Sequence, residues 1–320
     1  MERTERMSEP VDPQIAQWIC DLKNPNEDIR KKAVFSLGEK REKAASAVSE
    51  LIHMLPSEPN NVIRNNIART LGKIGDPQAV NALSEALFED DYYVKLNAAW
   101  ALGKIKDSRA VQPLLRLIKG GGAKVYTESG SDSYVDQDKP VTETLKTEGM
   151  RYHDVQINAI KALGEIKDES AVGGLVAELN DDTGTVRCAV ALSLGNIGSE
   201  KAVPALIEAL NDKIWYMRRD AAIALGQIGD PRAVEALIHK LQDPYEEVVE
   251  ESVKAIIHIG PAAVAKTFLL RPKDQRVQEM MKSIFQSRDE IIKALMEVAE
   301  KEEDLEKRAR FKNKINSLQG

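Results

Sequence analysis

The hydrophobic positions of residues 217–242 follow two successive helical patterns. Apolar residues recur at spacings of three and four from Met217 to Ile228, which is the spacing of one face of an α-helix. Residues 229–231 read Gly-Asp-Pro: a glycine that can close one helix, an aspartate that can cap the next, and a proline suited to a first helical turn. A second apolar stripe runs from Ala233 to Leu241. The segment predicts two antiparallel helices joined by a short turn.

The same pattern returns along the chain, with a Leu-Gly pair in the first helix and an Ala-Val pair at the start of the second. The glycines of successive pairs are 31, 61, 31 and 31 residues apart, and 61 is close to two periods. Such a period is typical of modules that bury their apolar faces against their neighbours. We predict an all-α protein, an α-solenoid (superhelix) of about seven helix pairs of about 31 residues with a terminal helical cap. The pairs are Leu71-Gly72, Leu102-Gly103, Leu163-Gly164, Leu194-Gly195 and Leu225-Gly226.

A basic residue stands near the start of most of the Leu-Gly helices. We expect these arginines to form an internal ladder of ion pairs with aspartates such as Asp76 and Asp230 in adjoining repeats, in preference to binding a ligand. The arginines are Arg30, Arg64, Arg187 and Arg218.

The pattern Asp-Pro-x-Ala-Val-x-x-Leu followed by Val-Arg-x-x-Ala-Ala-x-Ala-Leu-Gly-x-Ile-Gly resembles HEAT repeats of the PBS-lyase-like type. The resemblance covers about residues 13–270. Relatives of this type include the E and F subunits of phycobilin lyases, deoxyhypusine hydroxylase and many bacterial and archaeal proteins of undefined role. It implies the fold with high specificity and says almost nothing about activity.

The repeat pattern also sets the expected domain boundaries. We predict a flexible N-terminus over residues 1–12, a solenoid over 13–270 and capping helices over 271–320, where a capping box at 287–290 opens a long helix running through Leu305. Residues 120–153 lack every residue of the repeat and form a polar, Gly- and Ser-rich insertion. Its composition allows a small β-hairpin or disorder.

Charge and cysteine content narrow the setting in which the protein works. The chain carries 45 basic and 51 acidic residues, a net charge of −6, which disfavours nucleic acid and anionic membranes as partners. It has no run of apolar residues long enough to span a membrane and no segment resembling a secretory signal. Cys20 and Cys188 lie on apolar helix faces, which favours buried thiols in a reducing compartment. We therefore expect a cytoplasmic protein.

The sequence contains no recognisable catalytic motif. Its four histidines, His53, His153, His239 and His258, lack metal-ligand spacing. Deoxyhypusine hydroxylase holds iron with repeated His-Glu pairs, and this chain has none. No phosphate-binding loop or dinucleotide fingerprint is present. We predict no catalytic residues, no metal site and no cofactor.

The candidate binding residues fall into three groups. The pairs Tyr92-Tyr93 and Trp215-Tyr216, with Arg219, stand just before their Leu-Gly helices, where the rings either cover the turn between helices or form an interface hot spot that could also stack bases. A second group lies on the face of the Ala-Val helices, where the two glycines leave the surface bare. The insertion contributes the third. The second and third groups are Arg116, Gly173, Gly174, Ala177, Glu208 and His239, and Tyr126 and Tyr134.

These observations favour a non-catalytic scaffold or adaptor that grips another protein, of unidentified nature, and assists its assembly or modification. Two alternatives remain open. The resemblance implies a bilin-lyase-like enzyme subunit, although no residue identifies a chromophore site. A HEAT-type nucleic-acid-binding protein is the other, and the acidic balance disfavours it.

Overall fold

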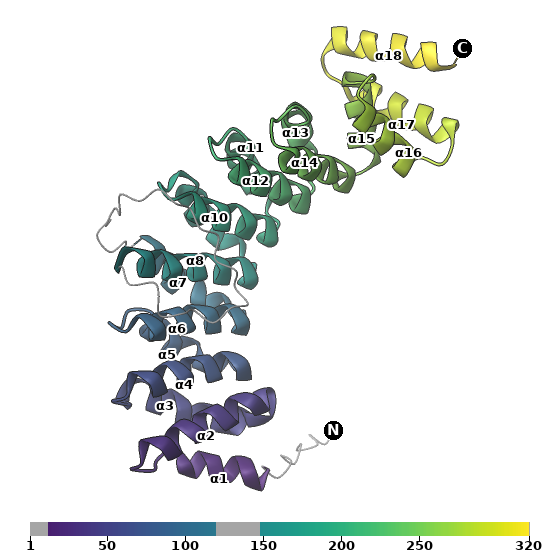
Figure 1. Ribbon diagram of the computed structural model, residues 1–320. Coiled ribbons are helices and arrows are strands. Elements are labelled where there is room, and N and C mark those ends of the chain that lie inside the picture. The colour runs from purple at the N-terminus through teal and green to yellow at the C-terminus, as the bar shows by residue number, and fades with distance from the viewer. Residues whose placement is uncertain (1–11, 120–147, 320) are drawn as a thin grey trace. The chain divides into compact units, whose positions relative to one another are not determined.

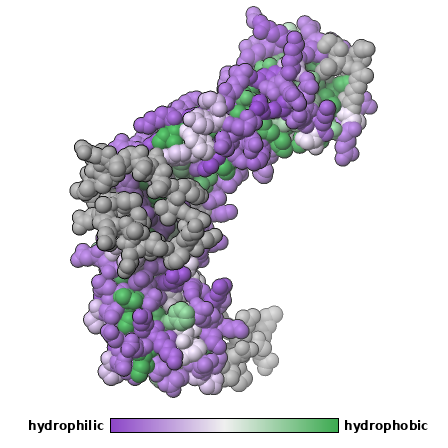
Figure 2. Space-filling view, viewed as in Figure 1, coloured by the Kyte–Doolittle hydropathy of each residue, from purple (hydrophilic) through white to green (hydrophobic). Residues whose placement is uncertain are grey.

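The structure, a computed structural model, describes residues 12–119 and 148–319. Every regular element in these two ranges is a helix, as the sequence predicts. None of the helices within them is both long enough and apolar enough to cross a membrane. On the face shown in Figure 2, the described surface is mostly hydrophilic, with hydrophobic residues in small separate areas.

Leu-Gly helices and Ala-Val helices alternate along the chain (Figure 1), and a short 3-10 helix precedes most of the latter. Helices in the Leu-Gly position are α2 (Glu27–Lys40), α4 (Asn61–Ile74), α6 (Tyr92–Ile105), α8 (Glu148–Ile166), α10 (Gly184–Ile197), α12 (Trp215–Ile228) and α14 (Glu246–Ile259). Helices in the Ala-Val position are α3 (Val48–Ser57), α5 (Val80–Ala86), α7 (Val111–Lys119), α9 (Val172–Ala177), α11 (Val203–Ala209), α13 (Val234–Lys240) and α15 (Pro261–Leu270). The 3-10 helices are η1 (Arg41–Ala47), η2 (Pro77–Ala79), η3 (Ser108–Ala110), η4 (Glu169–Ala171), η5 (Glu178–Asn180), η6 (Glu200–Ala202) and η7 (Pro231–Ala233).

The helices form pairs that differ from the predicted ones, in which each Leu-Gly helix pairs with the Ala-Val helix that follows it. Each Leu-Gly helix packs more closely on the helix that precedes it than on the one that follows, so that α1 (Pro13–Asp21) pairs with α2 and α3 pairs with α4. The described ranges therefore contain seven hairpins, from α1/α2 to α13/α14. The N-terminal helix α1 belongs to a complete hairpin with α2.

The chain divides into two compact units, Met1–Ala171 and Val172–Gly320. The boundary falls between hairpin α7/α8 and hairpin α9/α10, so each unit contains whole hairpins. Within each unit the Leu-Gly helices stack directly on one another.

The glycine of the Leu-Gly pair allows this close stacking. A Cβ atom added to Gly72 would lie 2.7 Å from the Cα of Ala101 in the next Leu-Gly helix, and one added to Gly226 would lie 2.9 Å from the Cα of Ala255. Both distances are shorter than van der Waals contact. The backbones of neighbouring Leu-Gly helices thus approach at a position that no side chain can fill.

The predicted arginine ladder is present, but its acidic partners are different. Arg187 forms a two-pronged ion pair with Asp212, at 2.9 and 3.1 Å, and also donates to the carbonyl of Asp181 at 2.8 Å. Each arginine thereby ties the turn before its own helix to the turn before the next Leu-Gly helix. Asp76 and Asp230, the partners predicted from the sequence, instead cap 3-10 helices. The four pairs are Arg30 with Glu58, Arg64 with Glu89, Arg187 with Asp212, and Arg218 with Asp243.

Helices α16 (Gln275–Ile284), α17 (Arg288–Lys301) and α18 (Leu305–Gln319) follow the last hairpin. Ser287 caps α17 as predicted, since its hydroxyl accepts the Glu290 N–H. The prediction of one continuous helix is wrong, because α17 ends at Lys301. Asp304 then caps α18 by accepting hydrogen bonds from the N–H groups of Glu306 and Lys307. Side chains from α15, α17 and α18 then form a separate apolar cluster, whose buried members are Ala265, Leu269, Leu295, Ala299, Phe311 and Ile315.

The insertion and the two cysteines differ in part from what the sequence predicts. The expected insertion, 120–153, extends too far, because α8 already begins at Glu148; residues 120–147, with Tyr126, Tyr134 and the hairpin proposed there, lie outside the described residues. The prediction of two buried thiols is correct for Cys188 and wrong for Cys20, which is exposed in α1.

Candidate functional site

The predicted aromatic pairs are the first two residues of α6 and of α12, not residues that precede these helices. Within each pair the rings meet edge to face, with centroids 4.9 Å apart for Tyr92 and Tyr93 and 5.8 Å apart for Trp215 and Tyr216. Neighbouring residues of a helix do not share a face, so the two rings of a pair point in different directions. The pair Tyr92-Tyr93 lies in the first unit, and the pair Trp215-Tyr216 lies in the second.

In the second unit one ring of the aromatic pair contacts a further ring next to α14. Trp215 stacks on Tyr245, with centroids 5.4 Å apart and an interplanar angle of 12°. The guanidinium of Arg219 lies 5.5 Å from the Trp215 ring, and that of Arg218 lies 5.6 Å from the Tyr245 ring. Tyr245 was not among the predicted site residues. Its place at the start of a helix in the Leu-Gly position, one residue before Glu246, is the signal that could have identified it.

In the first unit the aromatic pair reaches a carboxyl group on the next Leu-Gly helix. The Tyr92 hydroxyl donates a hydrogen bond of 2.9 Å to Oδ2 of Asp154 in α8. Burial raises the pKa of the Asp154 carboxyl, and the bond from Tyr92 partly opposes this shift. Tyr93 is 41% exposed beside this pair. Asp154 is therefore a carboxyl group that holds its proton to a higher pH than usual and is hydrogen-bonded to the partner ring of an exposed tyrosine.

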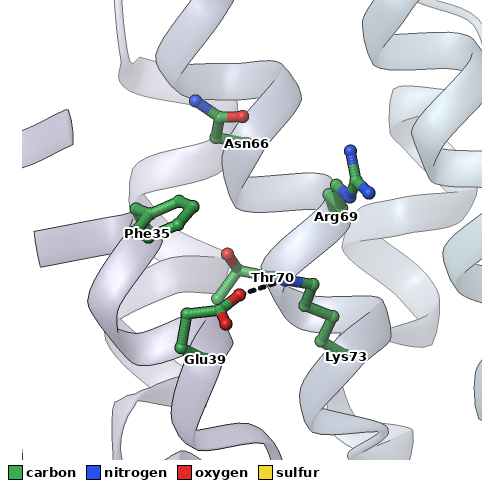
Figure 3. A pocket seen from close by; sticks show the side chains of 6 residues that line it. All are labelled: Phe35, Glu39, Asn66, Arg69, Thr70 and Lys73. Atoms are coloured by element: carbon green, nitrogen blue, oxygen red, sulfur yellow. Dashed lines mark hydrogen bonds and ion pairs between the residues drawn. The ribbon is translucent and has the colours of Figure 1, made fainter. Parts of the chain in front are cut away.

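A hollow of about 300 Å³ lies between α2 and α4 in the same unit (Figure 3). An ion pair of 2.6 Å between Lys73 and Glu39 crosses one side of it. Phe35 lines the hollow although its side chain is 63% exposed, and Asn66 and Arg69 also line it. The hollow thus combines an aromatic surface with hydrogen-bond donors and acceptors, and the sequence analysis named none of its residues.

Cys188 in α10 is not a candidate nucleophile. Its side chain is buried, and the thiol lies 3.8 Å from the sulfur of Met217. Burial, together with the neighbouring Asp220 carboxyl, raises the pKa of the thiol. Because the thiolate is the reactive form, a raised pKa leaves this cysteine inert at neutral pH.

The predicted residues of the Ala-Val helices are mostly exposed, but no interaction gathers them into one site. In the first unit, Arg116 covers the ring of Phe88, with 4.0 Å between the guanidinium carbon and the ring centroid. In the second unit, Gly173, Ala177, Glu208 and His239 are exposed and Gly174 is half-buried. Their role in binding stays a prediction.

Among the residues that the structure describes, no cluster of histidine, cysteine and acidic side chains could hold a metal ion. In the first unit, Asp154 combines a raised pKa with a side-chain hydrogen bond from Tyr92.

Comparison with known proteins identifies the repeat family and relatives in sequence. The profile of the HEAT-repeat family matches residues 15–93, 48–128, 148–223, 172–257 and 207–280. The phycocyanobilin lyase subunit alpha of Thermosynechococcus vestitus is 35% identical over 202 residues, which cover 55% of this chain and 73% of that protein. The subunit of the same name from a Nostoc species is 28% identical over 186 residues, which cover 52% of this chain and 67% of that protein.

A solved structure of the complex of CpcE and CpcF of phycocyanin lyase, from a Nostoc species, also matches. The match has a TM-score of 0.46 and 24% identity, and covers 89% of this chain and 99% of that chain. At this TM-score the likeness supports no argument about function.

These relatives overturn the functional prediction made from the sequence. A non-catalytic scaffold or adaptor was expected, yet the relatives in sequence are named as subunits of a lyase. The repeat pattern indicates how the helices stack. The same stack can serve a scaffold or an enzyme subunit, so the pattern does not distinguish between them. The alternative that the resemblance implied agrees better with the relatives.

Proposed function

This chain belongs to the HEAT-repeat family and, with the phycocyanobilin lyase alpha subunits, to its PBS-lyase-like branch, and on this premise we propose that it is a subunit of a bilin-lyase-type enzyme. The observation that carries the proposal is the 35% identity to the Thermosynechococcus subunit over 73% of its length. The proposed reaction is the transfer of a bilin chromophore to an acceptor protein.

A lyase adds a group to a double bond or removes one from it, so a proton has to be moved during the reaction. We assign this task to Asp154. Its raised pKa favours the protonated form nearer to neutral pH, and the Tyr92 hydroxyl at 2.9 Å fixes the orientation of the carboxyl group. A positioned carboxyl group with a raised pKa is suited to general acid–base catalysis.

The aromatic pair that reaches Asp154 through Tyr92 supports the choice of a conjugated substrate. Tyr93 presents an exposed aromatic surface, held edge to face by Tyr92, at the start of α6. Flat conjugated molecules bind to such surfaces by stacking and by burial of apolar area. The chromophore would lie on this surface, with one of its proton-bearing groups directed to Asp154.

The word subunit in the relatives' names indicates that a second protein takes part. We propose that the exposed Ala177, Glu208 and His239 of the second unit contact this protein, because they lie on consecutive Ala-Val helices. The reaction is placed in the cytoplasm, where free thiols such as those of Cys20 and Cys188 persist.

The test is a reconstituted transfer reaction containing phycocyanobilin, an apo-phycobiliprotein acceptor, the second lyase subunit and this chain. The product is chromophore absorbance that stays with the acceptor after denaturation. Asp154→Asn should lower the transfer rate by about a hundredfold, because it removes the proton-transfer group. Glu85→Gln is the matched control, since Glu85 is an exposed acid on α5 of the same unit and should leave the rate unchanged. An Asp154→Asn variant as fast as the wild type would show that Asp154 is not the proton-transfer group.

A further inference from the structure

Three asparagines occupy one position of the repeat on consecutive Leu-Gly helices. Asn66, Asn97 and Asn158 each stand six residues before the glycine of their Leu-Gly pair, on α4, α6 and α8. We call these residues the asparagine row. Equivalent positions lie side by side in this unit, because ion pairs join Lys73 to Glu39 and Lys104 to Glu165, all four of which stand one residue after their glycine. The row therefore crosses three stacked helices.

The amide groups of the row have unused hydrogen-bonding capacity. Asn66 and Asn158 are half-buried, and neither makes a hydrogen bond to any residue that the structure describes. Asn97 donates through Nδ2 to the side chain of Asn65 and to the carbonyl of Tyr93, the latter at 3.0 Å, so its own carbonyl oxygen is available. A side-chain amide offers both a donor and an acceptor, which matches the N–H and C=O of a peptide main chain.

A second row runs beside the first, one helical turn further along each helix. It alternates aromatic and basic side chains and consists of Phe35, Arg69, Trp100 and Lys161, each three residues before its glycine. Arg69 is exposed and forms no ion pair with the described residues, while Phe35 exposes 63% of its surface over the hollow in Figure 3. This row offers apolar and cationic contacts in turn.

The charge on this face selects an acidic partner. Glu39 and Glu165 are paired with Lys73 and Lys104, and Glu39 also feels the charge of Arg69, but these two acids are outnumbered by the basic side chains of this face. Arg69 is exposed, and so is Lys32, which occupies on α2 the repeat position that Asn66 occupies on α4. Neither forms an ion pair with the described residues. A local excess of positive charge thus lies on a chain whose net charge is −6.

We propose that the asparagine row binds an extended acidic segment of a partner protein. Asn66, Asn97 and Asn158 hydrogen-bond its main chain, Arg69 pairs with an acidic side chain, and Phe35 packs against an apolar one. Packed helices are about 8 to 10 Å apart, so about every third residue of an extended segment meets the next helix. This inference goes beyond the proposed lyase role and does not depend on it.

The test uses the full chain and a fluorescein-labelled peptide, followed by fluorescence anisotropy. The probe is Leu-Ala-Ser-Glu-Ala-Ser-Leu-Ala-Ser-Glu, which places leucine and glutamate in turn at every third position. One matched peptide carries lysine in place of each glutamate, and another carries N-methyl groups on alternate main-chain nitrogens. We expect saturable binding of the probe, and at least about tenfold weaker binding of both matched peptides.

The protein variants test the row itself. The double variant Asn66→Ala/Asn158→Ala should bind the probe about tenfold more weakly, and Arg69→Glu should remove the preference for glutamate over lysine. Neither asparagine side chain hydrogen-bonds to another described residue, so their replacement costs the fold no such bond, and thermal melts check that the variant stays folded. Asn196→Ala is the control, because Asn196 is an exposed asparagine on a Leu-Gly helix of the second unit and lies outside the row.

The proposal is overturned if the probe does not bind, or if it binds no better than the lysine peptide or the N-methylated peptide. An unchanged affinity of a folded double variant, or an equal loss in Asn196→Ala, also overturns it. Tighter binding of an oligothymidylate than of the probe would assign the face to single-stranded nucleic acid instead. Loss of bilin transfer with peptide binding intact would count against the lyase role alone.

Discussion

The glycine of the Leu-Gly pair differs physically from the glycines at the bare surface of α9. Gly72→Ala would place a Cβ 2.7 Å from both the Cα and the Cβ of Ala101, so α4 and α6 would have to separate. We expect a loss of about 1 to 3 kcal/mol in the free energy of unfolding, measured by urea denaturation.

Gly173→Ala is the matched control. A Cβ at Gly173 would meet no heavy atom within 4 Å, and alanine favours a helix over glycine by about 1 kcal/mol. This variant should therefore be as stable as the wild type or more stable. If Gly72→Ala were the better tolerated of the two, the close approach of the helices would not require glycine.

The pair formed by Arg30 and Glu58 makes stability depend on pH. Hydrogen bonds from Arg30, at 2.8 and 2.9 Å, hold the pKa of the Glu58 carboxyl below its ordinary value of 4.5, and Glu58 is only 4% exposed. A lowered pKa gives stability that is complete above pH 4.5 and is lost as the pH falls through the folded-state pKa. Glu58→Gln leaves the Arg30 charge unpaired and should cost about 3 kcal/mol at neutral pH.

The difference in unfolding free energy between wild type and Glu58→Gln should shrink as the pH is lowered below 4.5. Glu50→Gln is the control, because Glu50 pairs with Lys23, whose side chain is 69% exposed, and such a pair should contribute less than about 1 kcal/mol. A cost that is independent of pH would mean that the ionised pair is not its source.

Sequence reasoning identified the arginines of the ladder but not their partners. The spacing of Arg187 and Arg218 fixes their place on a helix, whereas their carboxylate partners depend on how the flanking turns pack. Cys20 shows the same limit, since an apolar helix face is buried only where a neighbouring element covers it. Asp154 lacked a sequence signal, because its raised pKa arises from burial in the assembled stack.

At the scale of the helix, the repeat depends on how each Leu-Gly helix ends. Gly75, Gly198 and Gly229 close their helices with φ between 75° and 79°, while Lys106 and Lys167 adopt the same left-handed conformation with φ of 59° and 60°. A side chain in this conformation costs about 1 to 2 kcal/mol relative to glycine.

Lys106→Gly should therefore stabilise the protein by about 1 kcal/mol in urea denaturation, because it removes this strain. Lys31→Gly is the control, since Lys31 is an exposed residue inside α2 and its replacement should destabilise by about 1 kcal/mol. A loss of stability in Lys106→Gly would show that the lysine side chain makes a compensating contact.

The sequence predicted which segments form the repeated helices, but not how these helices pair or where α17 ends. Periodicity predicts the apolar stripe of every repeat, but it does not say on which side of a Leu-Gly helix its closer partner lies, and the hairpin phase was missed. The break before α18 had a signal that was overlooked. Asp304 is a favoured capping residue, and the exposed Leu305 did not belong to the apolar stripe of α17.

At the scale of the whole molecule, the fold followed from the sequence and the function did not. Repeated Leu-Gly and Ala-Val pairs specify the stacked helices, and this stack serves equally for scaffolds and enzymes. Comparison with the lyase alpha subunits supplied the distinction, and the structure then directed attention to Asp154, Tyr92 and Tyr93.

The most direct test of the lyase role is whether this chain can replace an alpha subunit. Transfer of phycocyanobilin to the acceptor would be measured with the second lyase subunit of Thermosynechococcus vestitus, first with that organism's own alpha subunit, then with this chain, and then with neither. The account predicts that this chain restores denaturation-resistant chromophore on the acceptor to a level well above the reaction without an alpha subunit. A chain that stays folded and joins the second subunit, yet gives no more product than its omission, would contradict the account.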